Sequence, residues 1–234
     1  MANISHELRT PISTILGYSE VLLDPNFTSD PQAILERVVT NGQELSQLMD
    51  SLLDFSRIET GSMEANLQTV NVREVLQSLE MMATRLIKGR PIRFRLQIEP
   101  PLDVIETDAK KLQQILMQLL TNALKFTEKG EIALEVKSRF DSGDAFVEIC
   151  VSDTGIGISK RDQEVIFEEF RQLDGSSTRQ YGGTGLGLGL CRKLARSLGG
   201  RIEVESEVGR GSIFSLMLPV RRSSPEISRE VEAF

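Results

Sequence analysis

The single histidine of the chain, His6, lies in the stretch ISHELRTPIS near the start of the sequence. An unperturbed imidazole has a pKa of about 6.5, so it is mostly uncharged and nucleophilic just above neutral pH. Glu7 follows directly, and Thr10 lies one helical turn beyond His6 on the same face. Pro11 has no amide hydrogen, which predicts a bend beside the histidine. Taken alone, however, such a histidine is best explained as a solvated helix residue.

Glycine-bearing segments further along the chain could hold phosphate, namely DTGIGI (153–158), GGTGLGLGL (182–190) and GRGS (209–212). Glycine lets a backbone approach a ligand closely, and the free amides of a helix N-terminus bind anions. One such segment alone is weak evidence, because glycines are common at turns. Together the three predict a nucleotide site. The site is neither a Walker A loop nor a Rossmann fingerprint, because the sequence contains neither pattern.

A third group of polar residues falls on the segment 108–126, which predicts a helix with a leucine-rich apolar face. Asn122 and Lys125 are three residues apart and therefore neighbours on its surface, and Gln118 lies one turn before Asn122. An amide oxygen suits Mg²⁺, and a lysine suits phosphate. The alternative is an ordinary solvated polar face.

Two long helices are predicted to present the histidine. Apolar residues recur at helical spacing over 3–23 and again from Ile34 to Ile58, with a turn at 24–31 between them. Helices joined in this way form an antiparallel hairpin. One hairpin cannot bury both apolar stripes well, whereas two hairpins can pair into a four-helix bundle. We therefore expect an all-α hairpin that forms a homodimer.

After Gly61 the pattern changes to mixed helices and strands. We predict helices over 72–88, 108–126, 160–170 and up to about Leu198, and strands over 92–98, 103–107, 131–139, 145–152, 201–208 and 212–219. This order favours a two-layer α+β sandwich. The expected domains are 1–62 for the hairpin, 63–220 for the sandwich and 221–234 for a polar tail or linker.

Composition argues against several classes of partner. The net charge of −7 disfavours nucleic acid or an anionic membrane. No apolar run approaches the roughly 20 residues that span a bilayer, so we expect no membrane contact by this fragment. Two cysteines without metal-binding spacing fit reduced thiols in a cytoplasmic protein. Because Met1 stands within a helical pattern, we expect the sequence to be part of a longer protein.

Six segments in one order resemble the transmitter core of two-component sensor histidine kinases: ISHELRTP, NALKFT, DTGIGI, IFEEFRQLD, GGTGLGL and GRGSIFSLMLP. The resemblance covers about residues 3–220 and is strongest to the branch found in hybrid kinases, in which a receiver domain follows the core. It implies a dimeric helical hairpin joined to a Bergerat-fold ATPase domain. That fold is shared with chaperone, mismatch-repair and type II topoisomerase ATPases.

By this resemblance His6 is the phosphoacceptor. Glu7 would hydrogen-bond the far ring nitrogen and take up its proton, and Thr10 would orient water for dephosphorylation of the partner. The resemblance thus implies an ATP-dependent kinase that phosphorylates its own histidine. The phosphoryl group would pass to an aspartate on a response-regulator receiver domain, which the kinase could also dephosphorylate.

The resemblance also assigns an ATP site with Mg²⁺. Asp153 would read the exocyclic amine of adenine, Asn122 would bind the metal and Lys125 a phosphate. The other nucleotide-binding residues that it implies are Phe126, Gly155, Gly157, Arg179, Gly183, Thr184, Gly185, Leu186, Gly187 and Ser212. Residues 171–182 match the lid of the site, and Phe167 and Phe170 either anchor that lid or simply pack in the core.

Two positions depart from the family pattern. Gln118 stands where many relatives have asparagine, so a second metal contact there is left open. Gly189 replaces the more usual alanine, and glycine inside a helix costs up to about 1 kcal/mol. Two alternatives to the kinase remain open. Gln118 fits a regulator that binds nucleotide without transferring phosphate, whereas a conformational ATPase would not need SHELRTP. The resemblance also leaves open a membrane anchor in a longer protein.

Overall fold

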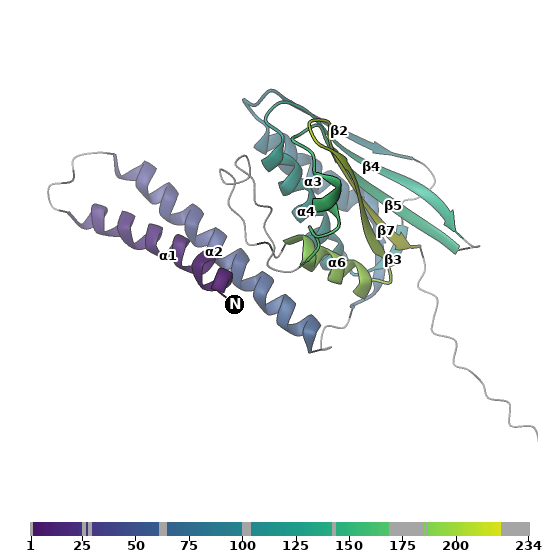
Figure 1. Ribbon diagram of the computed structural model, residues 1–234, viewed down its shortest axis with the longest axis horizontal. Coiled ribbons are helices and arrows are strands. Elements are labelled where there is room, and N and C mark those ends of the chain that lie inside the picture. Colours follow the sequence, from purple (N-terminus) through teal and green to yellow (C-terminus); the bar gives the residue numbers. More distant parts are fainter. Residues whose placement is uncertain are drawn as a thin grey trace, which may run out of the picture.

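The computed structural model describes residues 2–24, 27, 30–60, 65–99, 104–141, 144–168, 185 and 187–220. Helices α1 (Ala2–Leu23) and α2 (Pro31–Glu59) lie side by side as an antiparallel hairpin (Figure 1). Asp30 caps α2, because its carboxylate accepts a hydrogen bond from the backbone N–H of Gln32 at 2.9 Å. Pro31 begins the helix, where a missing amide hydrogen costs nothing. The predicted helical hairpin is confirmed.

Each helix of the hairpin also leaves a row of large apolar side chains exposed. Within each row the residues are spaced at close to whole turns of about 3.6 residues, so they share one helix face. The rows comprise Ile12, Leu16 and Leu23 on α1 and Leu35, Val39, Met49 and Leu53 on α2. A single hairpin therefore leaves an apolar surface in water.

Helices α3 (Val72–Leu86), α4 (Ala109–Phe126) and α6 (Gly187–Ser197) cover one face of a five-stranded sheet (Figure 1). The strand order is β2-β4-β5-β7-β6. Their bounds are β2 (Ile92–Ile98), β4 (Gly130–Asp141), β5 (Asp144–Asp153), β6 (Arg201–Glu207) and β7 (Gly211–Pro219). β2 pairs parallel with β4, and the other pairs are antiparallel. The predicted α+β two-layer sandwich is confirmed.

Two local predictions differ from the structure. β1 (Gln68–Asn71) was not predicted, because only Thr69 and Val70 of its four residues favour strands; it pairs antiparallel with β3 (Val104–Thr107). The helix predicted over 160–170 is too long, since α5 comprises only Lys160–Gln163. There the Gln163 side chain donates hydrogen bonds to two backbone carbonyls at 2.8 Å, and turns replace the helix.

The core between the helices and the sheet is aliphatic, as the scarcity of aromatic residues predicts. The largest fully buried side chains are all leucine and isoleucine. Phe167 is also buried and packs edge-on against Phe214, with ring centroids 6.4 Å apart. Phe167 therefore packs in the core, while Phe170 lies outside the described residues.

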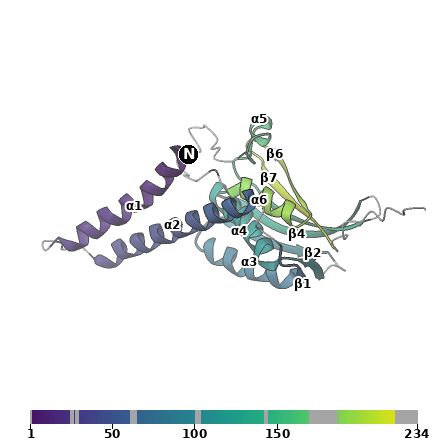
Figure 2. The same ribbon diagram turned by 90° about the horizontal axis from the view of Figure 1, so that it is seen from below.

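The hairpin contacts the sandwich through the C-terminal part of α2, which runs beside α4 and α6 (Figures 1 and 2). The Gln114 amide donates a hydrogen bond to the Asp54 carboxylate at 2.8 Å. The Lys193 ammonium lies 4.0 Å from the ring centroid of Phe55, a cation–π contact. Ile58 packs against the core of the sandwich. We call these contacts the α2 docking contact. No helix in the described part of the chain is long and apolar enough to span a membrane.

Candidate functional site

Helix α4 is fastened at both ends. Asp108 caps its N-terminus by accepting hydrogen bonds from two backbone N–H groups, and it also accepts one from the Lys111 ammonium at 3.0 Å. At the other end the Arg90 guanidinium donates to the carbonyls of Leu124 and Thr127, at 2.8 and 2.7 Å. These contacts replace the partners that a helix end lacks. They fix the last turns of α4, which carry the predicted metal and phosphate ligands.

The polar residues of α4 meet the start of α6. The Gln118 amide donates a hydrogen bond to the Asn122 side-chain oxygen at 3.2 Å. A Cβ atom added to Gly187, the first residue of α6, would lie 2.6 Å from the Gln118 carboxamide carbon. The Lys125 ammonium lies 5.3 Å from the ring centroid of Phe126. The structure thus brings Asn122, Gln118 and Gly187 together.

The DTGIGI loop, which follows β5, is held between the end of α4 and the turn that joins β6 to β7. A Cβ added to Gly155 would overlap the carbonyl oxygen of Phe126, and one added to Gly157 would overlap that of Glu207. Gly157 also has a positive φ of 68°, which other residues rarely adopt. The backbone N–H of Ile156 donates to the same Phe126 carbonyl at 3.3 Å. Close packing of backbone on backbone therefore explains both glycines.

Asp153 lies at the exit of β5 and faces this loop. Its carboxylate accepts hydrogen bonds from the backbone N–H of Gly155, at 2.8 Å, and of Ser212. Burial raises the pKa of Asp153 above its ordinary value, and these two hydrogen bonds offset the effect only in part. An ionised carboxylate in a partly buried site is a strong acceptor for an amine hydrogen.

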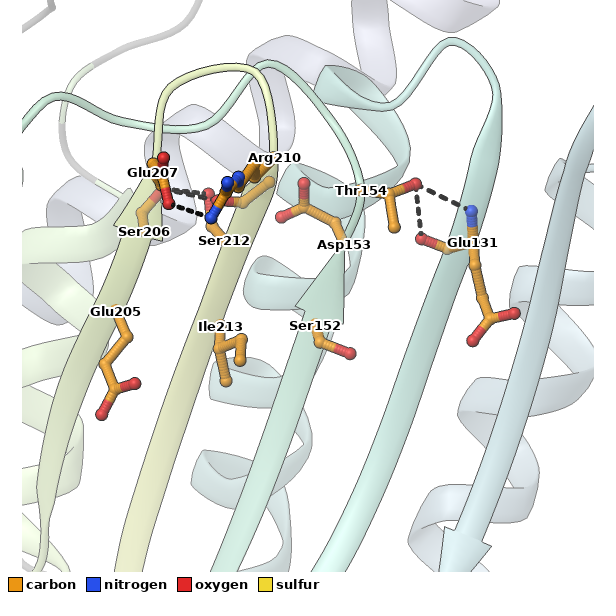
Figure 3. Close-up of a pocket in the computed structure, with 11 residues that line it drawn as sticks. Glu131, Ser152, Asp153, Thr154, Glu205, Ser206, Glu207, Arg210, Ser212 and Ile213 are labelled. Carbon is orange, nitrogen blue, oxygen red and sulfur yellow. Dashed lines mark hydrogen bonds and ion pairs between the residues drawn. The ribbon is translucent and has the colours of Figure 1, made fainter.

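A pocket of about 440 Å³ opens where the strands end at this loop (Figure 3). Asp153 and Ser212, both predicted site residues, line it together with Thr154. The Ser212 hydroxyl lies 3.0 Å from that of Ser206, and the Thr154 hydroxyl accepts from the Glu131 backbone N–H at 2.9 Å. The other lining residues are Glu131, Ser152, Glu205, Ser206, Glu207, Arg210, Gly211 and Ile213. Asn122 and Lys125, on α4, do not line this pocket.

The histidine segment forms the first turns of α1. The helix continues through Pro11, and the bend expected there stays a prediction. Thr10 is exposed, whereas the side chains of His6 and Glu7 lie outside the described part of the structure. Gly185 has a positive φ of 65°. The remaining predicted positions outside the described residues are Arg179, Gly183, Thr184, Leu186, the lid at 171–182 and the tail at 221–234.

Sequence reasoning missed several residues that organise the site. Arg90 follows a helix and precedes a strand, and nothing in its neighbourhood signals that it reaches the end of α4. Asp108 could have been recognised as a cap, because an aspartate stands just before a strong helical pattern. The α2 docking contact joins Asp54 to a residue 60 positions away, without a local signal.

Two family models match the chain. The model of histidine kinase-, DNA gyrase B- and HSP90-like ATPases matches residues 107–222, which include Asn122, Asp153 and Ser212. The model of the His Kinase A (phospho-acceptor) domain matches residues 1–61, which include His6. The two matches thus fall on the sandwich and on the hairpin.

Curated relatives include signal-transduction proteins and histidine kinases of several organisms. The hybrid signal transduction protein dokA of Dictyostelium discoideum is 38% identical over 96% of this chain. The circadian input-output histidine kinase CikA of Synechococcus elongatus is 39% identical over 94% of it. The chain spans 14% and 29% of the length of these two relatives.

Solved structures give the same picture. Full-length ShkA in complex with AMPPNP superposes with a TM-score of 0.71 at 28% identity, over 96% of this chain and 46% of that chain. The histidine kinase ThkA in complex with the response regulator protein TrrA superposes with a TM-score of 0.66 at 25% identity, over 94% and 60%. Because it joins a phospho-acceptor domain to an ATPase domain, and its relatives are hybrid and sensor kinases, the chain belongs to the histidine kinase family.

Proposed function

We propose that this chain is a transmitter core that phosphorylates His6 from ATP and passes the phosphoryl group to an aspartate of a receiver domain. The observation that supports this best is a combination of two features. The chain's single histidine lies in a phospho-acceptor hairpin, and glycine-containing loops lie in an ATPase domain. Either part alone would fit other functions. We assign the hairpin to 1–62, the ATPase domain to 63–220 and the tail to 221–234.

In the proposed reaction an imidazole nitrogen of His6 attacks the γ-phosphorus of ATP. A nitrogen–phosphorus bond forms as the bond to the bridging oxygen breaks, and ADP leaves. Glu7 accepts the hydrogen bond from the other ring nitrogen and so orients the ring. It takes up the proton of that nitrogen as the bond to phosphorus forms. The N–P bond is later broken when a carboxylate of the receiver domain attacks the phosphorus, which returns His6 to its free form. Thr10 would orient the water that later hydrolyses the phosphorylated aspartate of that partner.

The residues for nucleotide binding lie on both sides of the DTGIGI loop. Asp153 would accept a hydrogen bond from the adenine amine, and Ser212, which lines the same pocket, would contact the nucleotide beside it. Gly187 begins an eleven-residue helix whose first amides suit phosphate. The other contacts that we assign are Lys125, Phe126, Gly155, Gly157, Arg179, Gly183, Thr184, Gly185 and Leu186.

Magnesium fits the oxygen donor that α4 offers. Asn122 is only partly buried, and its amide oxygen has a second acceptor position beside the one that Gln118 occupies. Asn122 would hold the ion, which neutralises charge on the transferred phosphoryl group when bound. Lys125 would add a second positive charge there.

Two partners are proposed, a second copy of the chain and a receiver domain. The exposed apolar rows on α1 and α2 support pairing with a second copy into a four-helix bundle. A receiver domain is supported by the structural neighbour ThkA, which was solved with the response regulator TrrA. We also expect the described domains to act in the cytoplasm, with any membrane anchor in a longer protein.

The test is radiolabelling with γ-labelled ATP and Mg²⁺. We expect label that is lost in acid and kept in base, absent from His6→Gln and unchanged in Ser13→Ala, an exposed position on the same helix. Binding of ATP without any label would point to a non-catalytic regulator. Release of free phosphate without labelled protein would point to a conformational ATPase.

A further inference from the structure

We propose that Gln118 is a positioning residue and not a metal ligand. It orients the Asn122 side chain and fixes the spacing between α4 and the start of α6. The inference deepens the proposed function and rests on it, because it concerns the residue assigned to the metal.

The hydrogen bond between the two amides sets which atom Asn122 presents. The Gln118 amide nitrogen donates to the Asn122 oxygen at 3.2 Å. An amide oxygen has two acceptor positions, so the second stays available for a cation. If the donor were lost, the Asn122 amide could rotate and present its NH₂ group, which repels a cation. Gln118 therefore determines whether Asn122 can act as a ligand.

The packing of Gln118 argues against direct coordination. Its terminal carboxamide lies close to Gly187: an added Cβ there would be 2.6 Å from its carbon, 2.7 Å from its nitrogen and 3.0 Å from its oxygen. The carboxamide nitrogen donates to Asn122. Turning the oxygen toward a metal held by Asn122 would break that hydrogen bond. The side chain instead joins α4 to the first residue of α6.

The same packing means that a side chain at position 187 would displace Gln118. The nearest atoms that a side chain there would meet all belong to Gln118. Overlap at these distances forces a neighbour to move, and the neighbour is the residue that orients Asn122. The spacing of the two helices and the orientation of the ligand are therefore coupled through one side chain.

The first test is Gln118→Glu at pH 8, where the new carboxylate is ionised. The dissociation constant of AMPPNP is measured by calorimetry in Mg²⁺ and in EDTA. The value in EDTA divided by the value in Mg²⁺ gives the metal dependence, that is, how many times more tightly AMPPNP binds when Mg²⁺ is present. A carboxylate cannot donate to Asn122 and attracts its NH₂ group, so we expect this ratio to fall about tenfold or more. Affinity in EDTA should stay within about twofold of the unaltered chain.

Gln113→Glu is the matched control, because it makes the same change at an exposed position of α4. An unchanged or increased ratio in Gln118→Glu would overturn the inference, since the carboxylate would then act as a ligand. An equal loss of affinity in Mg²⁺ and in EDTA would also overturn it, because Gln118 would then only support the fold.

The second test uses the contact with Gly187. Gly187→Ala should weaken AMPPNP binding in EDTA, and adding Gln118→Ala should restore that binding by removing the overlap. The double variant should still lack the metal dependence. A double variant as weak as Gly187→Ala in EDTA would refute the packing argument. If the unaltered chain failed to bind AMPPNP at all, the proposed function would fall and this inference with it.

Discussion

Asp153 shows at the scale of one residue how a binding site can cost stability. Burial raises the pKa of its carboxyl group, so the folded chain holds this proton more tightly than the unfolded chain does. Stability from this group is therefore greatest below the unfolded pKa of about 3.9 and decreases as pH rises through the raised folded value. At neutral pH the ionised carboxylate therefore lowers the stability of the fold, and we propose that this charge serves nucleotide binding.

Asp153→Asn tests this trade-off. We expect a melting temperature at pH 7 equal to or above that of the unaltered chain, and AMPPNP affinity weaker by about tenfold, or ~1.4 kcal/mol. In the unaltered chain affinity should fall as pH decreases through the raised pKa, while the variant should show no such dependence. Asp50→Asn, at an exposed position on α2, is the control. A clear loss of melting temperature in Asp153→Asn alone would contradict the argument.

The positions of Asn122 and Asp153 were predictable, because both stand in short motifs that specify residue type and spacing: Asn122 lies near the end of α4 and Asp153 at the end of β5. Their roles, and that of His6, stay predictions. The positioning role that we propose for Gln118 could not be predicted from the sequence. Whether an amide binds a metal or a neighbouring side chain depends on its rotamer and on a contact with α6, 69 positions further along (187 − 118). Residue types give the candidates, and only packing assigns them.

Helix α4 carries the proposed metal and phosphate ligands, Asn122 and Lys125, and the contacts at its ends fix where these two residues lie. The pattern predicted this helix well, because a capping aspartate and a leucine-rich face both mark it. Arg90 at its far end is different. Its hydrogen bonds go to backbone carbonyls 34 and 37 positions away, and no local pattern encodes such a contact. Short elements such as β1 were missed for a related reason, since tertiary pairing forms them.

Arg90→Ala should therefore loosen the end of α4. Two hydrogen bonds from a charged donor are lost, and we expect the free energy of unfolding to fall by about 1–2 kcal/mol. AMPPNP affinity should fall as well, because Asn122 and Lys125 lie in the last turns of the helix. Urea denaturation and calorimetry measure the two effects. Arg93→Ala removes a neighbouring arginine that is 83% exposed and should change neither.

The whole molecule is expected to be a dimer, because its hairpin leaves two apolar rows in water. The exposed row on α2 was not predicted, because other apolar residues of that helix, from Ile34 to Ile58, already form a regular helical stripe. The contact between hairpin and ATPase domain was missed because it joins distant residues, two of them polar. Long-range surface contacts of this kind leave no periodic signal.

Leu16→Arg tests the dimer. The residue is 58% exposed in the single chain, and a charge there should shift the equilibrium toward monomer without unfolding the hairpin. Val21→Arg is the control, because Val21 is also exposed but lies on the opposite face of α1. Sedimentation at several concentrations measures the equilibrium, with helicity followed by circular dichroism. Equal dissociation by both variants would argue against this interface.

The α2 docking contact has a consequence for how the two domains influence each other. Gln114 and Lys193 lie on α4 and α6, the helices that also carry Asn122 and Gly187. If docking shifts α4 or α6, then docking and nucleotide binding are linked equilibria, and thermodynamic linkage makes their coupling reciprocal. The factor by which docking changes the affinity for nucleotide equals the factor by which bound nucleotide changes the docking equilibrium. A structural change in α2 would then alter the affinity of the nucleotide site. Nucleotide binding would in turn alter the docking of α2, which packs beside α1, the helix that contains His6.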